Sequence, residues 1–370
     1  MYYNIYEWEN IANIFLGWQS HLTQKEGFDM NHRLVYLDML RSAAVLFGTL
    51  AVILHAWTAF YNWCSFIILP VLVCISAYFS AAVLRIHTFR SFFNAKWLRI
   101  GIPWLIAAVF FAPEESFITY LQQGGTADFI TFYLQNWGSS SYAAGTHWFL
   151  GFLLLLCIVL MGLKKWNRQL LQHRVQSQPG PVFFFLFIVL STLLLYGTEC
   201  LSSLHIAGVH ILPPRADWLC IGILYFALGI YAFRHRWFTA NGYIPPVGCF
   251  FAFLVISAAY GIVTASSFTA VPFLLPLLQT LLSLTAVFGL TAAFHTWGRI
   301  QADTARAASR FSYPFYFISE PIILNAFYFL QPLDIAYELK VLLVLLLTGV
   351  YSSLLCKYAL LHLPSFKRII

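Results

Sequence analysis

Apolar tracts near the length of a bilayer-spanning helix recur along the whole 370-residue chain. Crossing the ~30 Å hydrocarbon core of a membrane takes roughly 20 predominantly apolar residues. Because lipid cannot satisfy an open backbone, spans that follow one another in a chain must be helices. The sequence therefore predicts an all-α, polytopic transmembrane helix bundle of about ten spans. They are expected at 35–57, 65–84, 100–116, 147–163, 181–197, 216–233, 245–263, 270–295, 313–330 and 340–361.

The composition supports this fold class. Hydrophobic residues make up 60% of the chain and charged residues 9%, whereas soluble domains carry about 25% charged residues. We divide the chain into an N-terminal cytoplasmic or interfacial segment (1–33), a transmembrane domain (34–363) and a cytoplasmic tail (364–370). Met30 begins a run that would itself make a sensible start, so residues 1–29 are expected either to be peripheral or not to belong to the functional protein.

The basic residues alternate with the predicted spans. With the N-terminus inside, all but three of the 21 Lys and Arg residues (Arg41, Arg215 and Lys340) fall in the parts expected to be cytoplasmic, which are the two ends of the chain and every second connection. The positive-inside rule predicts this bias. Both termini are then expected in the cytoplasm. The net charge of +7 is a topology signal and gives no reason to propose a nucleic-acid partner.

The first predicted span carries two ionisable residues, Arg41 and His55, separated by apolar or small residues. Ionisable residues inside a span are costly and usually face the bundle interior. Fourteen positions correspond to roughly 21 Å along a helix and to a difference of about 40° in direction, so both residues share one face. The alternative is a snorkelling arginine and a histidine that only hydrogen-bonds a neighbour.

Two basic residues enter the third span. Lys96 and Arg99 are three positions apart and face the same way on a helix. One interpretation is an anion site for phosphates at the cytoplasmic mouth. The other is a topology signal with contacts to lipid headgroups.

The outer ends of the spans carry further candidates. Glu114 and Glu115 lie at the expected outer mouth of the third span, and Trp137 lies in the long loop 117–146 that follows. This loop either binds a sugar by stacking and hydrogen bonding or packs on the bundle as a plug. His147 lies where the fourth span begins.

Glu320 lies about eight residues into the ninth span, at a depth similar to that of Arg41 in the first. A buried Arg41–Glu320 pair is therefore predicted. The seven cysteines are scattered, without a CxxC or a His/Cys cluster, so the sequence predicts no metal site.

Four stretches of the chain together resemble acyltransferase family 3 of membrane proteins. They are YLDMLRSAAVLFGTLAVILHAW in the first span, FFNAKWLRIGIPWLI, GTHWFLGFLLLL and SYPFYFISEPII, and they occur in the family's order. Within that family, the branch of glucan biosynthesis protein C, an O-acyltransferase branch, is the nearest resemblance. The chain departs from the pattern in two places. Thirteen rather than ten residues separate Arg41 from His55, and the family's late histidine falls at Ser319, beside Glu320.

The resemblance implies transfer of an acyl group, acetyl or succinyl, from cytoplasmic acyl-CoA to a hydroxyl of an extracytoplasmic carbohydrate. Acyl-CoA is then a donor substrate, and no permanently bound cofactor is expected. Lys96, Arg99 and Arg41 would hold the CoA phosphates, and His55 would act as the base, since an imidazole pKa lies near the working pH.

The remaining candidates have secondary roles in this interpretation. Glu114 or Glu115 would orient His55 or contact the acceptor with Trp137. His147 would be a second base, and Glu320 would act with Arg41. The alternative class is a transporter or flippase without acyl-transfer chemistry, because intramembrane Arg, Glu and His also mark transport pathways.

Overall fold

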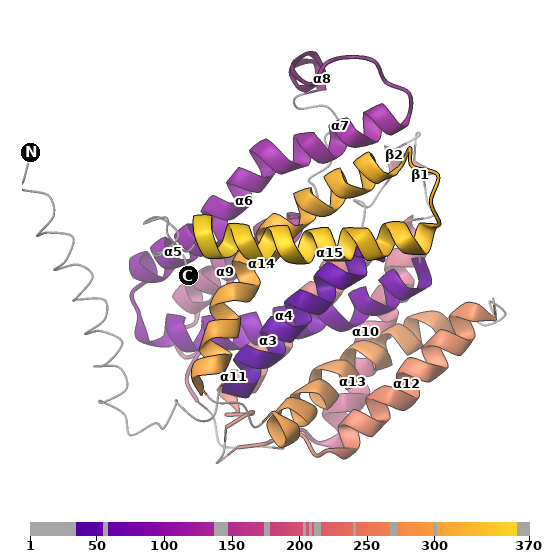
Figure 1. The fold of residues 1–370 in the computed structure, drawn as a ribbon. Coiled ribbons are helices and arrows are strands. Elements are labelled where there is room, and N and C mark those ends of the chain that lie inside the picture. Colours follow the sequence, from indigo (N-terminus) through magenta and orange to yellow (C-terminus); the bar gives the residue numbers. More distant parts are fainter. Residues whose placement is uncertain are drawn as a thin grey trace, which may run out of the picture.

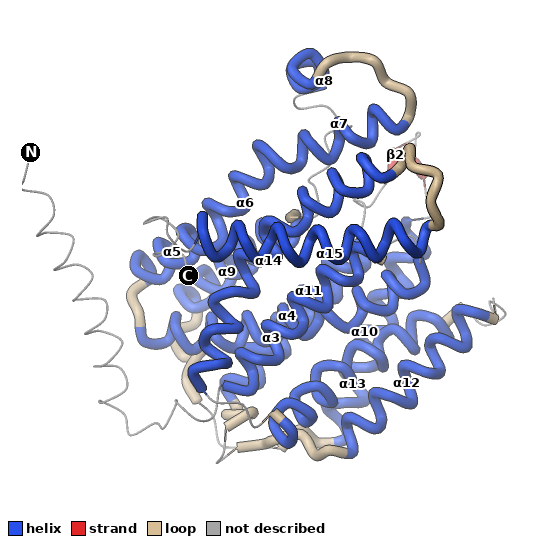
Figure 2. Tube along the Cα trace, viewed as in Figure 1, coloured by secondary structure: helices blue, strands red, loops and turns tan. Residues whose placement is uncertain are grey.

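The computed structural model describes residues 35–54, 58–136, 147–173, 178–202, 205–206, 209–210, 216–239, 242–266, 272–298 and 302–360. Nearly all of this chain is helical (Figure 2). The N-terminal half contains α3 (Val35–Ile53), α4 (Thr58–Ile86), α5 (Phe89–Lys96), η1 (Trp97–Gly101), α6 (Ile102–Ile106), η2 (Ala107–Phe111), α7 (Ala112–Gln122), α8 (Phe129–Asn136) and α9 (Trp148–Trp166). The remainder contains α10 (Pro181–Ser202), β1 (His205–Ile206), β2 (Val209–His210), α11 (Ala216–Arg234), α12 (Gly248–Ala265), α13 (Leu274–Trp297), α14 (Ala302–Leu330), α15 (Tyr337–Leu355) and η3 (Cys356–Leu360).

Nine helical runs in the described part of the chain are long and apolar enough to cross a membrane. This confirms the all-α, multi-pass bundle. The ninth predicted span, 313–330, is not among these nine runs; it falls inside α14, which is 29 residues long but less apolar than the others. Glu320 and Asn325 contribute to its lower hydropathy.

Helix α4 forms the centre of the bundle. It packs against α3, α9, α11, α12 and α13. In its most apolar stretch of 18 residues, 67% of the residues are buried, compared with 11% in α12. Helix α12 instead pairs with α13 along one side of the bundle, while α15 packs across α14 and α3 (Figure 1). The exposed apolar side chains of peripheral helices are expected for surfaces that contact lipid.

The third span is part of a single 34-residue helical run, Phe89–Gln122, which is longer than the predicted 100–116. It contains two π turns, η1 and η2, and each is followed by a proline two residues after its end, Pro103 and Pro113. Proline cannot donate the backbone hydrogen bond of a regular α-turn. Such π turns within α-helices are frequent at functional sites.

Candidate active site

A cavity of about 390 Å³ lies among α3, α4, α9, α14 and the run that contains α5 and η1. Ligand-binding pockets typically have volumes of about 300–1,000 Å³. Its walls are mostly apolar, and its charged lining residues are Arg41, Lys96 and Arg99. Three of the sequence-predicted site residues therefore line one cavity, although they come from two segments far apart along the chain.

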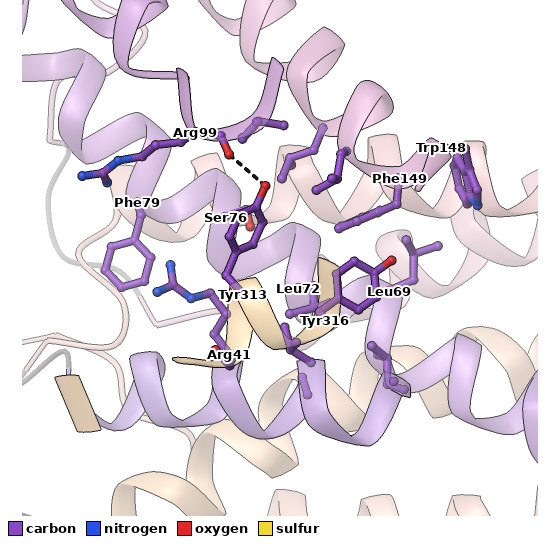
Figure 3. Close-up of a pocket in the computed structure, with 18 of the residues that line it drawn as sticks. Arg41, Leu69, Leu72, Ser76, Phe79, Arg99, Trp148, Phe149, Tyr313 and Tyr316 are labelled. Atoms are coloured by element: carbon purple, nitrogen blue, oxygen red, sulfur yellow. Dashed lines mark hydrogen bonds between the residues drawn. The ribbon is translucent and has the colours of Figure 1, made fainter. Parts of the chain in front are cut away.

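The cationic side chains have defined surroundings. Nη2 of Arg41 lies 3.3 Å from Oδ1 of Asp38, one helical turn earlier. Nζ of Lys96 donates a hydrogen bond of 2.8 Å to Oγ of Ser80 on α4. Arg99 lies in η1, and Figure 3 shows its guanidinium and that of Arg41 at one end of the cavity, with Trp148 at the other.

Helix α3 presents one continuous face to the cavity. Arg41, Ala44, Gly48 and Val52 all line it, at the spacing of one helical stripe. The eleven positions from Arg41 to Val52 span about 16 Å at 1.5 Å per residue. His55 lies outside the described residues, so its place on this face stays a prediction.

Aromatic rings line the end of the cavity away from the arginines. Trp148 begins α9, and its ring centroid lies 6.0 Å from that of Trp218 on α11. The ring of Tyr61 on α4 lies 6.1 Å from the same Trp218. Tyr316 of α14 also lines the cavity. The cavity therefore combines a cationic end, an apolar middle and an aromatic end.

A second polar cluster lies behind Tyr316. Nδ1 of His147 lies 3.1 Å from Oε2 of Glu320, and the two side chains are only 4% and 7% exposed. Nε2 of His147 lies 3.3 Å from the carbonyl oxygen of Phe317. That carbonyl has no α-helical donor four residues later, because Pro321 lacks an N–H. The imidazole donates to it, and the other ring nitrogen is thereby directed at Glu320.

This geometry replaces the predicted Arg41–Glu320 pair. The structure places Arg41 against Asp38 and Glu320 against His147, so each residue has a different close partner from the predicted one. The prediction rested only on the similar depth of the two residues in their spans. Depth does not determine which way a helix face points. His147 and Glu320 are not among the described residues that line the cavity.

Of the residues predicted at the outer mouth, Glu114 contacts α14, the helix that also carries Glu320. Oε1 of Glu114 accepts a hydrogen bond of 2.7 Å from Asn325 of α14. Glu115 follows it in the first turn of α7. Trp137 lies outside the described residues.

Comparison with known proteins identifies the family. The model of an acyltransferase domain (Acyl_transf_3) matches residues 34–361. The chain belongs to acyltransferase family 3. It is therefore a multi-pass membrane acyltransferase. Neither the curated proteins nor the solved structures contain a match to this chain.

Several residues that line the cavity of this acyltransferase, or that contact its charged side chains, were not singled out from the sequence. Asp38 is part of the Leu-Asp-x-x-Arg start of the first span, and its spacing of three from Arg41 was a signal for the contact. Tyr313 and Tyr316 belong to the SYPFYFISEPII stretch and are spaced by one helical turn. In that stretch, charge alone drew a functional role from the sequence, and it drew it for Glu320.

Proposed function

We propose that this acyltransferase moves an acetyl or succinyl group from acyl-CoA to a hydroxyl of a carbohydrate on the outer face of a bacterial inner membrane. The observation that carries the proposal is the polarity of the cavity. It is cationic at one end, apolar along α3 and aromatic at the other end. Acyl-CoA has a matching order of parts, with anionic phosphates, an uncharged arm and a thioester.

The donor is expected to enter at the cationic end. Phosphates pair with Arg and Lys through charge-assisted hydrogen bonds, and Arg41, Lys96 and Arg99 supply three such groups. By the positive-inside rule, the basic segment that holds Lys96 and Arg99 faces the cytoplasm. This is the side on which acyl-CoA is available. The thioester would then lie along the α3 face that leads from Arg41 to Val52 and, three residues later in the sequence, to His55.

The reaction needs a group that takes a proton from the acceptor hydroxyl and then gives it to the leaving thiolate. In our proposal, His55 takes the proton of the acceptor hydroxyl as its oxygen attacks the thioester carbonyl. The C–S bond then breaks, and the thiolate of CoA recovers the proton, so that an ester and free CoA are formed. An imidazole suits both steps, first as the neutral base and then, once protonated, as the acid, because its pKa lies near physiological pH.

A carbohydrate acceptor is supported by the chemistry of the aromatic end. Trp148, Trp218 and Tyr61 provide flat apolar surfaces and polar ring atoms, a combination that suits groups with one apolar and one hydrogen-bonding side. Glu114, Glu115 and Trp137 would extend this acceptor site at the outer mouth. The His147–Glu320 pair would position Tyr316 and the adjoining wall of α14 from behind.

The test is release of thiol from acyl-CoA by the purified protein in detergent. Acetyl-CoA and succinyl-CoA are offered with and without a crude periplasmic glycan fraction, and free CoA is measured. We expect glycan-dependent release by the wild type and loss of release in His55→Ala, after folding of the variant has been verified. Equal release from both proteins would refute His55 as the base. No release with either donor, from protein that still binds CoA, would refute the proposed reaction.

A further inference from the structure

We propose that Tyr313 is a positioning residue of the donor site, whose hydroxyl holds the backbone at Arg99 and so sets the direction of the Arg99 guanidinium. This inference rests on the proposed binding of acyl-CoA by the cationic end of the cavity. It assigns a role to a residue of α14 that is separated from Arg99 by more than 200 positions in the sequence.

Pro103 removes one backbone donor from the turns that carry Arg99. In a regular α-helix, the N–H of residue 103 would donate to the carbonyl of Arg99, but proline has no N–H. The chain here forms the π turn η1, in which the N–H of Ile102 donates to the carbonyl of Trp97, five residues back. The sequence thus places a carbonyl without its α-helical donor on Arg99, which lines the cationic end of the cavity.

The hydroxyl of Tyr313 supplies a donor to this carbonyl. It lies 2.8 Å from the carbonyl oxygen of Arg99, as the dashed line in Figure 3 shows. The contact is exposed, so water competes for the carbonyl and the hydrogen bond adds only modestly to stability, but it ties the backbone of η1 to α14. A π turn has wider and less regular hydrogen bonding than an α-turn, so an external donor at this point restricts how the turn can move.

The neighbouring residue of α14 makes a second tie to the cationic end. Oγ of Ser312 donates to Oγ of Ser42 at 3.4 Å, and Ser42 directly follows Arg41 on α3. Consecutive residues of α14 therefore contact the two segments that carry Arg41 and Arg99. Both Ser312 and Tyr313 also line the cavity. We infer that this Ser-Tyr step sets the spacing of the two guanidinium groups that receive the phosphates.

The substitution Tyr313→Phe tests the hydroxyl alone, because the ring and its packing remain. A matched control is Tyr78→Phe. The hydroxyl of Tyr78 likewise donates to a distant carbonyl, that of Trp237, at 3.1 Å, but Tyr78 is not among the described residues that line the cavity. Both variants lose a hydrogen bond from a tyrosine hydroxyl to a backbone carbonyl. The bond lost in Tyr78→Phe is buried and the one lost in Tyr313→Phe is exposed, so a general loss of stability should be at least as large in the control.

The measurement is the equilibrium dissociation constant of coenzyme A, by calorimetric titration of the full-length protein in detergent. We expect Tyr313→Phe to weaken binding by about fivefold and Tyr78→Phe to leave it unchanged. Arg99→Gln removes the charge itself and is expected to weaken binding by tenfold or more. In the Arg99→Gln background, Tyr313→Phe should have no further effect, because the group it positions is absent.

The outcomes separate the two claims. If Arg99→Gln does not weaken coenzyme A binding, the donor site of the proposed function is wrong. If Arg99→Gln weakens it and Tyr313→Phe does not, only the positioning role of Tyr313 is wrong. If Tyr313→Phe weakens binding equally with and without the Arg99 guanidinium, the hydroxyl contacts coenzyme A directly or acts through general stability, and the positioning role is again refuted.

Discussion

Replacing Glu320 by leucine should destabilise the protein strongly, and replacing His147 as well should cost little more. The two side chains meet at 3.1 Å between Nδ1 and Oε2 and are almost completely buried. Nε2 of His147 faces the Phe317 carbonyl and must carry a hydrogen to donate to it. Nδ1 of this imidazole and Oε2 of Glu320 would then both be hydrogen-bond acceptors. Their contact is favourable only if one further proton lies between them, on either the nitrogen or the oxygen.

The expected magnitude follows from this arrangement. Breaking a buried ion pair by removing one member costs about 3–5 kcal/mol, and leaving a neutral buried polar group without its partner costs about 1–3 kcal/mol. We expect Glu320→Leu and His147→Leu each to lower the free energy of unfolding by about 3 kcal/mol, where the two ranges meet. The double variant leaves neither member of the pair alone, so its loss should fall short of the sum by about 2–3 kcal/mol.

The assay is unfolding of the purified variants in mixed micelles of a mild detergent and dodecyl sulfate. Glu338→Leu, which removes an exposed carboxylate from α15, serves as the control and should change the free energy by no more than about 0.5 kcal/mol. Losses that simply add in the double variant would refute the coupling between His147 and Glu320. A loss for Glu320→Leu no larger than that of the control would refute the buried pair.

Three further predictions concern other parts of the bundle. Lys96→Met should raise the KM for acyl-CoA by about tenfold in steady-state kinetics with little change in kcat, because it removes one of the proposed phosphate contacts. A lower kcat at unchanged KM would contradict this. Gly229→Ala should lower the unfolding free energy by about 1–3 kcal/mol, because its Cβ would collide with the carbonyl oxygen of Cys74 on α4. Gly261→Ala, which meets open space, should be neutral or stabilising, and equal effects of the two would refute the close packing. Asn325→Ala should cost about 1–3 kcal/mol in the same unfolding assay by removing the hydrogen bond to Glu114, and no loss would contradict that contact.

The spans could be predicted from the sequence because crossing lipid imposes a length and an apolar composition on each helix. Helix ends were predicted less well. The third span extends from Phe89 to Gln122, since its basic and aromatic start and its polar end continue the helix beyond the apolar tract 100–116. Hydropathy detects the apolar tract and does not detect helical extensions of other composition.

The cationic end of the cavity could be predicted because charge inside a membrane is costly and therefore informative. The partners of these charges could not be predicted from depth, since depth leaves the rotation of a helix about its axis undetermined. Glu320 faces His147 for this reason and has a different partner from the predicted Arg41. The prolines of the sequence carry a further signal for these contacts. Pro103 and Pro321 each leave the carbonyl four residues earlier without its α-helical donor, and both carbonyls are contacted by site residues.

The most direct test of the donor site compares two thioesters, acetyl-CoA and S-acetyl-N-acetylcysteamine, which has the same reacting group but no phosphates. Thiol release gives kcat/KM for each donor in the wild type and in Arg41→Gln and Lys96→Met. We predict that the wild type strongly prefers acetyl-CoA. Both substitutions should reduce this preference by about tenfold or more, leaving the truncated donor unaffected. A preference that is unchanged in both variants would show that the cationic end of the cavity does not bind the CoA phosphates.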